Sequence, residues 1–270
     1  MKIILSRKGF DSKFGGYPSP ILPDGTLLSL PIPDNCNAIK YDKLRYKERS
    51  YATIIKELTN GKFNEEKCHL DPDIRKDSLP SRPDGWKPAF GQSGAAMTHL
   101  NNQGVKEGDL FLFFGIFREA KEINGEYKYE RKCNPKHIIW GYLQIGEILN
   151  NPTKEQHSYL GTHPHLDRNS KSNTIFVAKD ILSFDKDKSG ASTLKYKPEL
   201  VLTKEGLSRT RWKLPDFLKD IKISYHSKDS WKENYFQSAH IGQEFVISAD
   251  GNEEVEKWAK DFICKEQSIN

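Results

Sequence analysis

Residues 91–118, GQSGAAMTHLNNQGVKEGDLFLFFGIFR, are the stretch from which the fold is best read. The run LFLFF at residues 110–114 has the length and aromatic content of a buried strand, and Gly108 and Gly115 stand on either side of it. The segment before it is small and polar. Its glycines and alanines leave little side-chain bulk, so another backbone or a ligand can approach closely.

The polar part of this stretch predicts a recognition surface. One imidazole and three amides fall within five positions at residues 99–103, and each amide offers both donors and acceptors. The alternative is a helix start and a turn in which the amides serve only capping. On the first interpretation, the residues that we predict to bind substrate here are Gln92, His99, Asn102 and Gln103.

Composition predicts a globular protein with a very polar surface. Of the 270 residues 36% are hydrophobic, enough for a core, while the mean hydropathy is −0.72. A net charge of +5 with 42 Lys and Arg is compatible with a nucleic-acid partner. The chain has no 18-residue apolar segment and only a four-residue apolar run near its start. We therefore expect a cytoplasmic protein that does not enter membranes.

The four cysteines, at positions 36, 68, 133 and 264, show no CxxC spacing. This scatter argues against a structural zinc site and against a disulfide framework. We expect reduced, unpaired thiols.

Further elements follow from apolar spacing and turn residues. Strands are expected at residues 2–5, 138–149 and 174–178, and helices at 51–58 and 253–264. Asn124-Gly125 predicts a hairpin, and Gly141 and Gly146 predict bends in the long strand. Since no linker or internal repeat interrupts the pattern, we predict a single α+β domain over residues 1–270, with a mixed, strongly bent sheet or barrel and flanking helices.

Two loops carry the residues that we predict to be catalytic. Lys8 and Asp11 follow the first strand, where charged groups beside glycines commonly belong to a site. His163 and His165 flank a proline, and such a turn fixes two imidazoles in directions suited to a proton donor or a phosphate contact. Metal binding by these histidines would need a further ligand from elsewhere in the chain.

A possible metal motif lies at His69, Asp71 and Asp73, which have H-x-D-x-D spacing. It falls in a loop at residues 62–87 that is rich in proline and aspartate. That frame favours Asx-turn roles for the two aspartates. We therefore predict no metal and no cofactor.

Two C-terminal segments complete the candidate list. Arg211 and Trp212 combine a cation with a large ring, which suits phosphate pairing and base stacking, although Trp212 could equally anchor in the core. Gln243 lies in a Gly-Gln-Glu segment that repeats the small polar character of residues 91–103. We predict that Arg211, Trp212, Gln243 and His163 contact the substrate.

The sequence resembles two groups of known protein domains. The pairing of GDLFLFF (108–114) with GYLQIGEI (141–148) resembles the strand pattern of PUA-like barrels, including the ASCH and EVE domains. The chain as a whole is similar to the third of the nucleotide modification associated domains, a prokaryotic family linked to DNA base modification. The segments that carry this similarity span nearly the whole chain: 5–25, 69–75, 91–118, 140–148, 162–166, 212–217 and 242–247.

The family resemblance implies a protein that meets modified bases in DNA. Its sharpest form is a DNA glycosylase that excises a hypermodified base, such as glucosylated hydroxymethylcytosine, in antiphage defence. By chemical type, Asp11 would stabilise the sugar cation and His165 or His163 would donate a proton to the leaving base. Lys8 would contact a phosphate or form an imine.

Three other functions fit the same residues. A non-catalytic reader of modified bases needs the amides and aromatic rings but no chemistry. A metal-dependent nuclease acting on modified DNA could use Asp11, Asp24, Asp71 and the histidines. An enzyme acting on free modified nucleotides would not need a basic surface.

Overall fold

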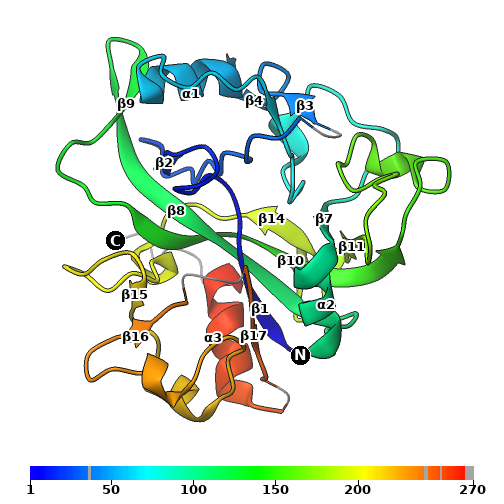
Figure 1. Cartoon of the computed structure of the whole chain (residues 1–270), viewed down its shortest axis with the longest axis vertical. Coiled ribbons are helices and arrows are strands. Elements are labelled where there is room, and N and C mark those ends of the chain that lie inside the picture. The colour runs from blue at the N-terminus through cyan, green and yellow to red at the C-terminus, as the bar shows by residue number, and fades with distance from the viewer. Residues whose placement is uncertain (36–37, 240–242, 250, 265–270) are drawn as a thin grey trace.

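The apolar run at residues 110–114 begins β8 (Leu110–Ile123), which crosses the middle of the main sheet in the computed structural model of the protein (Figure 1). Phe111, Phe113 and Phe114 are fully buried, as predicted. The structure describes residues 1–35, 38–239, 243–249 and 251–264. β8 lies between α1 and α3 in Figure 1, so the main sheet separates two helix-bearing halves of the molecule.

The main sheet is mixed, because β8 runs parallel to β1 and antiparallel to β10. Its path is β17-β1-β8-β10-β11-β7, with β2, β9 and β14 paired beside it. The remaining bounds are β1 (Ile3–Arg7), β2 (Ser19–Ile21), β7 (Ala89–Gln92), β9 (Glu126–Tyr129), β10 (Lys136–Asn150), β11 (Thr174–Ala178), β14 (Ala191–Thr193) and β17 (Glu244–Ile247).

Smaller elements surround this sheet. Two-stranded ladders are formed by β3 (Ile39–Lys40) with β6 (Lys67–Cys68), β4 (Arg45–Tyr46) with β5 (Arg49–Ser50), β12 (Ile181–Leu182) with β13 (Asp185–Ser189), and β15 (Arg211–Trp212) with β16 (Phe236–Gln237). The α-helices are α1 (Tyr51–Thr59), α2 (Gly94–Asn102) and α3 (Glu253–Cys264). Short 3-10 helices are η1 (Lys76–Ser78), η2 (Ser158–Leu160), η3 (Pro198–Leu200), η4 (Asp216–Asp220) and η5 (Lys228–Ser230).

The α+β class and the mixed sheet are confirmed, whereas the barrel alternative is not. Among the described strands, β17 and β7 are the two ends of an open path and do not pair with each other. The sheet bends where the glycines predicted it. The register of β10 shifts between Ile139 and Gly141 against β8, and between Ile145 and Glu147 against β11. A side chain at Gly146 would collide with the backbone of Lys179, 2.8 Å away.

Helix α1 shows how local sequence sets an element. Ser50 accepts a hydrogen bond from Thr53 N as the N-cap, and Asn60 ends the helix in the left-handed conformation at φ 51°. The buried residues Ile54, Ile55 and Leu58 recur at helical spacing and pack into the upper half of the molecule.

Strand pairing brings distant loops to one place. The end of β1 pairs with β17, with Ser6 opposite Glu244. Lys8 and Asp11 lie in the segment that directly follows β1. On the other side β7 pairs with β11, with Gly91 opposite Ile175. Although three strands separate β7 from β1 in the sheet, Gln92 at the end of β7 donates to Glu244 of β17 at 2.7 Å. The loops before β7 and before β11 therefore line one cleft together with the chain that follows β1.

No described helix has the length and apolar character required to cross a membrane. Cys68, Cys133 and Cys264 are free thiols, as predicted, and Cys36 lies outside the described residues.

Candidate functional site

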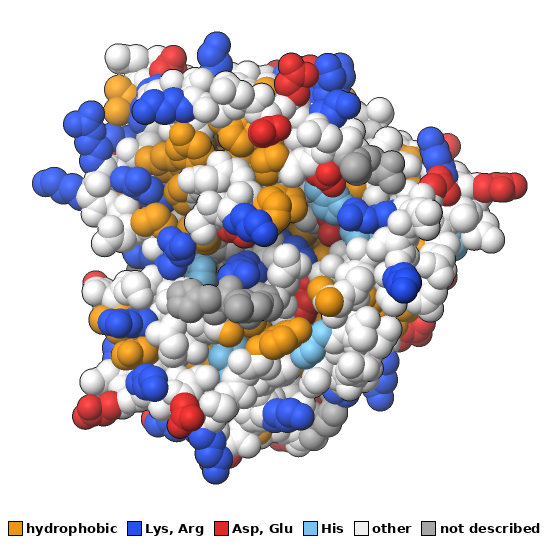
Figure 2. Space-filling model, viewed as in Figure 1, with side chains coloured by type: hydrophobic (Ala, Val, Ile, Leu, Met, Phe, Trp, Pro, Cys, Tyr) orange, Lys and Arg blue, Asp and Glu red, His pale blue; other side chains and the backbone are white. Residues whose placement is uncertain are grey.

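A cleft of about 170 Å³ opens where these loops meet. Figure 2 shows cationic and histidine side chains gathered around the hollowed middle of this face. Two other hollows, of about 500 and 840 Å³, are larger and also carry charged side chains, but no histidine is among the residues that line them. The cleft is lined by Arg7, Lys8, Gly9, Asp11, Phe14, Ile32, His69, Asp71, Gly91, Gln92, Ser93, His165, Arg168 and Gln243.

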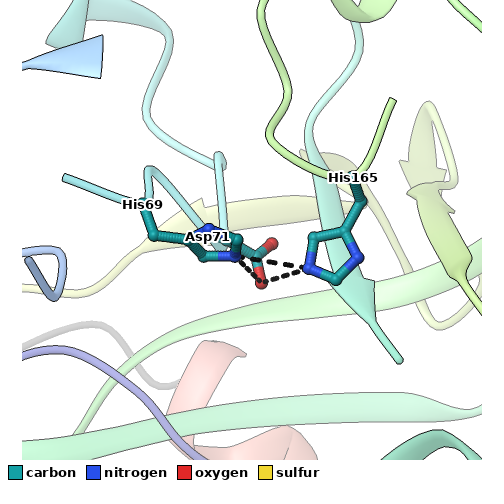
Figure 3. A group of neighbouring side chains, drawn as sticks. All are labelled: His69, Asp71 and His165. Atoms are coloured by element: carbon teal, nitrogen blue, oxygen red, sulfur yellow. Dashed lines mark hydrogen bonds and ion pairs between the residues drawn. The ribbon is translucent and has the colours of Figure 1, made fainter. Parts of the chain in front are cut away.

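Two imidazoles and one carboxylate meet inside the cleft. His69 Nε2 lies 3.3 Å from His165 Nε2 and 3.9 Å from Asp71 Oδ2, and His165 Nε2 lies 4.0 Å from the same oxygen. Figure 3 shows the three side chains pointing toward one another, two from the segment after β6 and one from the loop before β11. Within the described part of the chain, these three residues are the group that could hold a metal ion.

The outer nitrogens of both histidines are fixed by partners. His69 Nδ1 lies 3.1 Å from Asp34 Oδ2, and a carboxylate accepts only, so Nδ1 carries the proton. His165 Nδ1 lies 2.8 Å from Asn173 Oδ1, whose amide is oriented because its Nδ2 donates to His165 O. In the neutral rings both Nε2 atoms are therefore unprotonated and turn their lone pairs into the cluster.

Asp71 is held as an anion behind the two rings. Gly91 N donates to its Oδ1 at 2.7 Å, and His163 Nε2 lies 3.4 Å from the same atom. Burial alone would raise the pKa of Asp71, but hydrogen bonding to His163 and the fields of His165 and His163 outweigh it and hold that pKa well below its ordinary value. The carboxylate is only 5% exposed and stays ionised.

Burial acts in the opposite direction on the rings. It lowers the pKa of His165 to about 4, although the Asp71 carboxylate works against that change. The pKa of His69 is also lowered, chiefly by burial and again against the field of Asp71. Both rings are therefore neutral near pH 7 and act as acceptors.

A second buried network forms the neighbouring wall. Glu244 Oε1 accepts from Lys8 Nζ at 2.9 Å and from Gln92 Nε2 at 2.7 Å. Lys8 also stands over the ring of Phe90, 4.5 Å from its centroid. The second oxygen of Glu244 is buried without a hydrogen-bond partner among the described residues. Gln92 Oε1 accepts from Ser93 N, so both ends of this amide are already engaged.

The structure brings together five of the residues predicted from sequence and separates the others. Lys8, Asp11, Gln92, His165 and Gln243 line the cleft, and His163 lies directly behind Asp71. The cleft lining does not include His99, Asn102, Gln103, Arg211 or Trp212.

These outlying residues have other surroundings. His99 Nε2 hydrogen-bonds to Ser224 Oγ at 3.0 Å, and its ring lies tilted against that of Tyr225 with 4.2 Å between the centroids. Trp212 is fully buried and donates to His137 Nδ1, which makes it a core anchor. Arg211 stands over the ring of Tyr235.

His69 and Asp71 are cleft residues outside the predicted site list, because the sequence favoured a turn role for Asp71 and kept it only in the nuclease alternative. Asp71 accepts a hydrogen bond from Gly91, 20 positions away, instead of closing a local Asx-turn. Asp73 does not join the cluster, because it forms a paired ion bridge with Arg82 at 2.6 and 2.7 Å. Asp24, a candidate in the nuclease hypothesis, pairs with Tyr46 and Lys47 instead. The H-x-D spacing of His69 and Asp71 was the sequence signal for a metal-binding cluster, and the structure adds His165 as its third member.

The fold and the cleft define an α+β protein with cationic side chains around a buried pair of histidines and one carboxylate. The family model described as nucleotide modification associated domain 3 matches residues 2–248, so the chain belongs to this family. Membership links the protein to the modification of bases in DNA. No curated protein and no solved structure matches the chain.

Proposed function

We propose that the protein is an enzyme that acts on a modified base of DNA, and that its reaction is hydrolysis of the N-glycosidic bond to leave an abasic site. The observation that carries this proposal is the juxtaposition of Arg7 and Arg168 with the unprotonated Nε2 atoms of His69 and His165 in one cleft. Guanidinium groups suit the phosphates that flank an extruded nucleotide. Acceptor nitrogens suit activation of the attacking water.

The size of the cleft is consistent with the binding of a single nucleobase. Its volume of about 170 Å³ is below the roughly 300–1,000 Å³ of pockets that enclose drug-sized ligands. A base would enter, and a bulky substituent such as a sugar would extend through the mouth. We propose phage-type DNA with hypermodified bases as the substrate and defence against such DNA as the role, on the strength of the family link.

The chemistry adds one water across the bond between C1′ and the base nitrogen. The water oxygen bonds to C1′, the bonding electron pair leaves on the base nitrogen, and one proton of the water ends on the base or in solvent. The carboxylate of Asp11, fixed by hydrogen bonds from Lys13 N and Phe14 N at 2.7 Å, would stabilise the sugar cation.

The structure leads us to assign His165 and Lys8 roles that differ from those expected from the sequence. His165 donates its Nδ1 proton to Asn173, so its cleft-facing nitrogen accepts and serves the water instead of the leaving base. Lys8 is paired with Glu244, whereas imine formation needs a free amine, so we assign Lys8 to positioning and phosphate attraction.

The test is to incubate the protein with DNAs carrying unmodified, hydroxymethylated or glucosylated cytosine, and to assay alkali-labile sites. We expect sites on modified DNA, their loss in Asp11→Asn with DNA binding retained, and normal activity in Asp42→Asn, which alters an exposed carboxylate outside the cleft. If the protein retains modified DNA selectively but forms no abasic sites, the enzyme hypothesis fails and the protein is a non-catalytic reader of modified bases.

One observation favours a second candidate, a metal-dependent nuclease acting on modified DNA. His69, Asp71 and His165 converge as metal ligands do, and nucleases use such ions to activate water at a phosphate. The same assay separates the two, because a nuclease breaks strands without alkali. Strand breaks that EDTA abolishes would select the nuclease.

A further inference from the structure

We propose that His69, Asp71 and His165 form a binding site for one divalent transition-metal ion inside the cleft. The donor atoms are separated by 3.3, 3.9 and 4.0 Å. Three points with these separations lie on a circle of radius about 2.2 Å. An ion near its centre would stand about 2.2 Å from each atom, which matches metal–nitrogen and metal–oxygen bonds of about 2.0–2.2 Å.

The orientation of the rings supports the same site. With Nδ1–H donated to Asp34 in one ring and to Asn173 in the other, two lone pairs face each other across 3.3 Å. Two facing acceptors repel unless a cation lies between them. Hydrogen bonding of the outer nitrogen to a carboxylate or an amide oxygen is also how metal-bound histidines are held in most metal sites.

The carboxylate is positioned in a comparable way. Oδ1 of Asp71 accepts from Gly91 N and faces His163, which leaves Oδ2 directed at the two Nε2 atoms. The three ligands are nearly buried, with exposed side-chain fractions of 11%, 5% and 4% for His69, Asp71 and His165, yet all three line the cleft. An ion there would have three protein ligands and an open side toward the bound nucleotide.

The donor set selects the kind of ion. Mg²⁺ and Ca²⁺ prefer oxygen ligands, whereas two imidazoles and one carboxylate with open positions are typical of catalytic Zn²⁺ and of non-haem Fe²⁺. The site stands on this geometry alone. Its use in base excision rests on the proposed function, with one change: the two Nε2 lone pairs would hold the ion instead of accepting directly from the water. The ion would then lower the pKa of a bound water and so supply the hydroxide that attacks C1′.

The experiment is a titration of the chelator-treated 270-residue chain with Co²⁺, followed by visible absorption. We expect one Co²⁺ per chain, displacement by Zn²⁺ but not by Mg²⁺ at the same concentration, and at least tenfold weaker binding in His165→Ala and Asp71→Asn. His99→Ala is the matched control, since His99 does not line the cleft, and it should bind as the unaltered chain does.

Co²⁺ binding by the unaltered chain tests the proposal even if a variant fails to fold. If it binds no Co²⁺ at stoichiometric concentration, or if folded His165→Ala binds Co²⁺ equally well, the metal site is overturned. Metal binding without abasic sites would keep the site and remove base excision. Abasic sites formed equally well in EDTA would keep base excision and remove the metal from the reaction.

Discussion

The Nε2 atoms of His69 and His165 lie 3.3 Å apart although the residues are separated by 96 positions. Neither ring is placed by its neighbours in sequence. Asp34 holds the first ring at 3.1 Å and Asn173 holds the second at 2.8 Å. The cluster therefore depends on the hydrogen bonds around it as much as on its own three side chains, and this dependence can be measured.

Replacing Asp34 by Asn should weaken Co²⁺ binding about 10- to 100-fold without removing a ligand, because an outer carboxylate orients the ring of His69 and raises its basicity. The measurement is the Co²⁺ titration beside a thermal melt. Asp42→Asn, an exposed change of the same type, should leave the affinity unaltered. Equal affinities in the two variants would show that the contact to Asp34 does not support metal binding.

Replacing Gly91 by Ala should disrupt the cluster from the side of β7. A methyl group at this position would overlap the ring of His165 and come within 2.9 Å of its Cβ. Since the surrounding strands β7 and β11 are buried, we expect a loss of about 1–3 kcal/mol of unfolding free energy. Co²⁺ affinity should fall with it, whereas the neighbouring Ser93→Ala should change neither quantity. A Gly91→Ala protein with unaltered metal affinity would contradict the placement of His165.

The parts of the fold that sequence reasoning captured are those where local chemistry decides the outcome. The strand at 174–178, the helix at 253–264 and the bends at Gly141 and Gly146 all follow from apolar period or from a missing side chain. The open path of the sheet could not be obtained this way. It depends on which strands pair across the whole chain, and a short pattern shared with barrel proteins does not encode closure.

The site was half predicted for a related reason. The segment after the first strand and the His-Pro-His turn were identified because unusual residue types gather locally, and both reach the cleft. Asp71 was assigned to a turn and His69 was left without a role, because their loop is rich in proline and aspartate and their partner His165 lies 96 positions after His69. Trp212 takes the second of the two roles that its sequence context allowed, since its ring fills the core and is not available for base stacking.

Replacing Glu244 by Gln should destabilise the protein strongly. The carboxylate is buried and accepts from Lys8 Nζ and Gln92 Nε2, and the Lys8 side chain is only 10% exposed. Removing one charge of a buried pair leaves the other uncompensated, which costs about 3–5 kcal/mol. Denaturant unfolding measures the loss. The double variant Lys8→Met with Glu244→Leu should be more stable than Glu244→Gln, and the reverse order would show that the pair is not coupled.

Stability should depend on Asp24 as the pH falls. Burial alone would raise the pKa of Asp24, but hydrogen bonds from Lys47, Tyr46 and Thr26 outweigh it and lower that pKa. Because the folded-state pKa lies below the unfolded value of about 3.9, the carboxylate contributes stability above that pH and loses the contribution as the pH falls through the folded-state pKa.

Asp24→Asn should accordingly lower the unfolding free energy by about 1 kcal/mol at pH 7, a partly exposed charged contact being worth little more. The difference between variant and unaltered chain should shrink as the pH is lowered toward 2. Thermal melts across that range measure it. A difference that stays constant with pH would mean that the Asp24 charge contributes nothing to folding.

Replacing Arg168 by Gln should weaken binding to all DNAs by a similar factor. Arg168 lies three positions after His165 and lines the cleft, where a guanidinium would meet a phosphate beside the bound base. Loss of one phosphate contact should make the plot of log affinity against log salt concentration shallower by about 0.9. The matched control is Lys257→Gln on α3, where Lys257 pairs with Asp261 outside the cleft. If the control changes the slope as much as Arg168→Gln does, the positive charge acts through the whole surface and the cleft has no special phosphate contact.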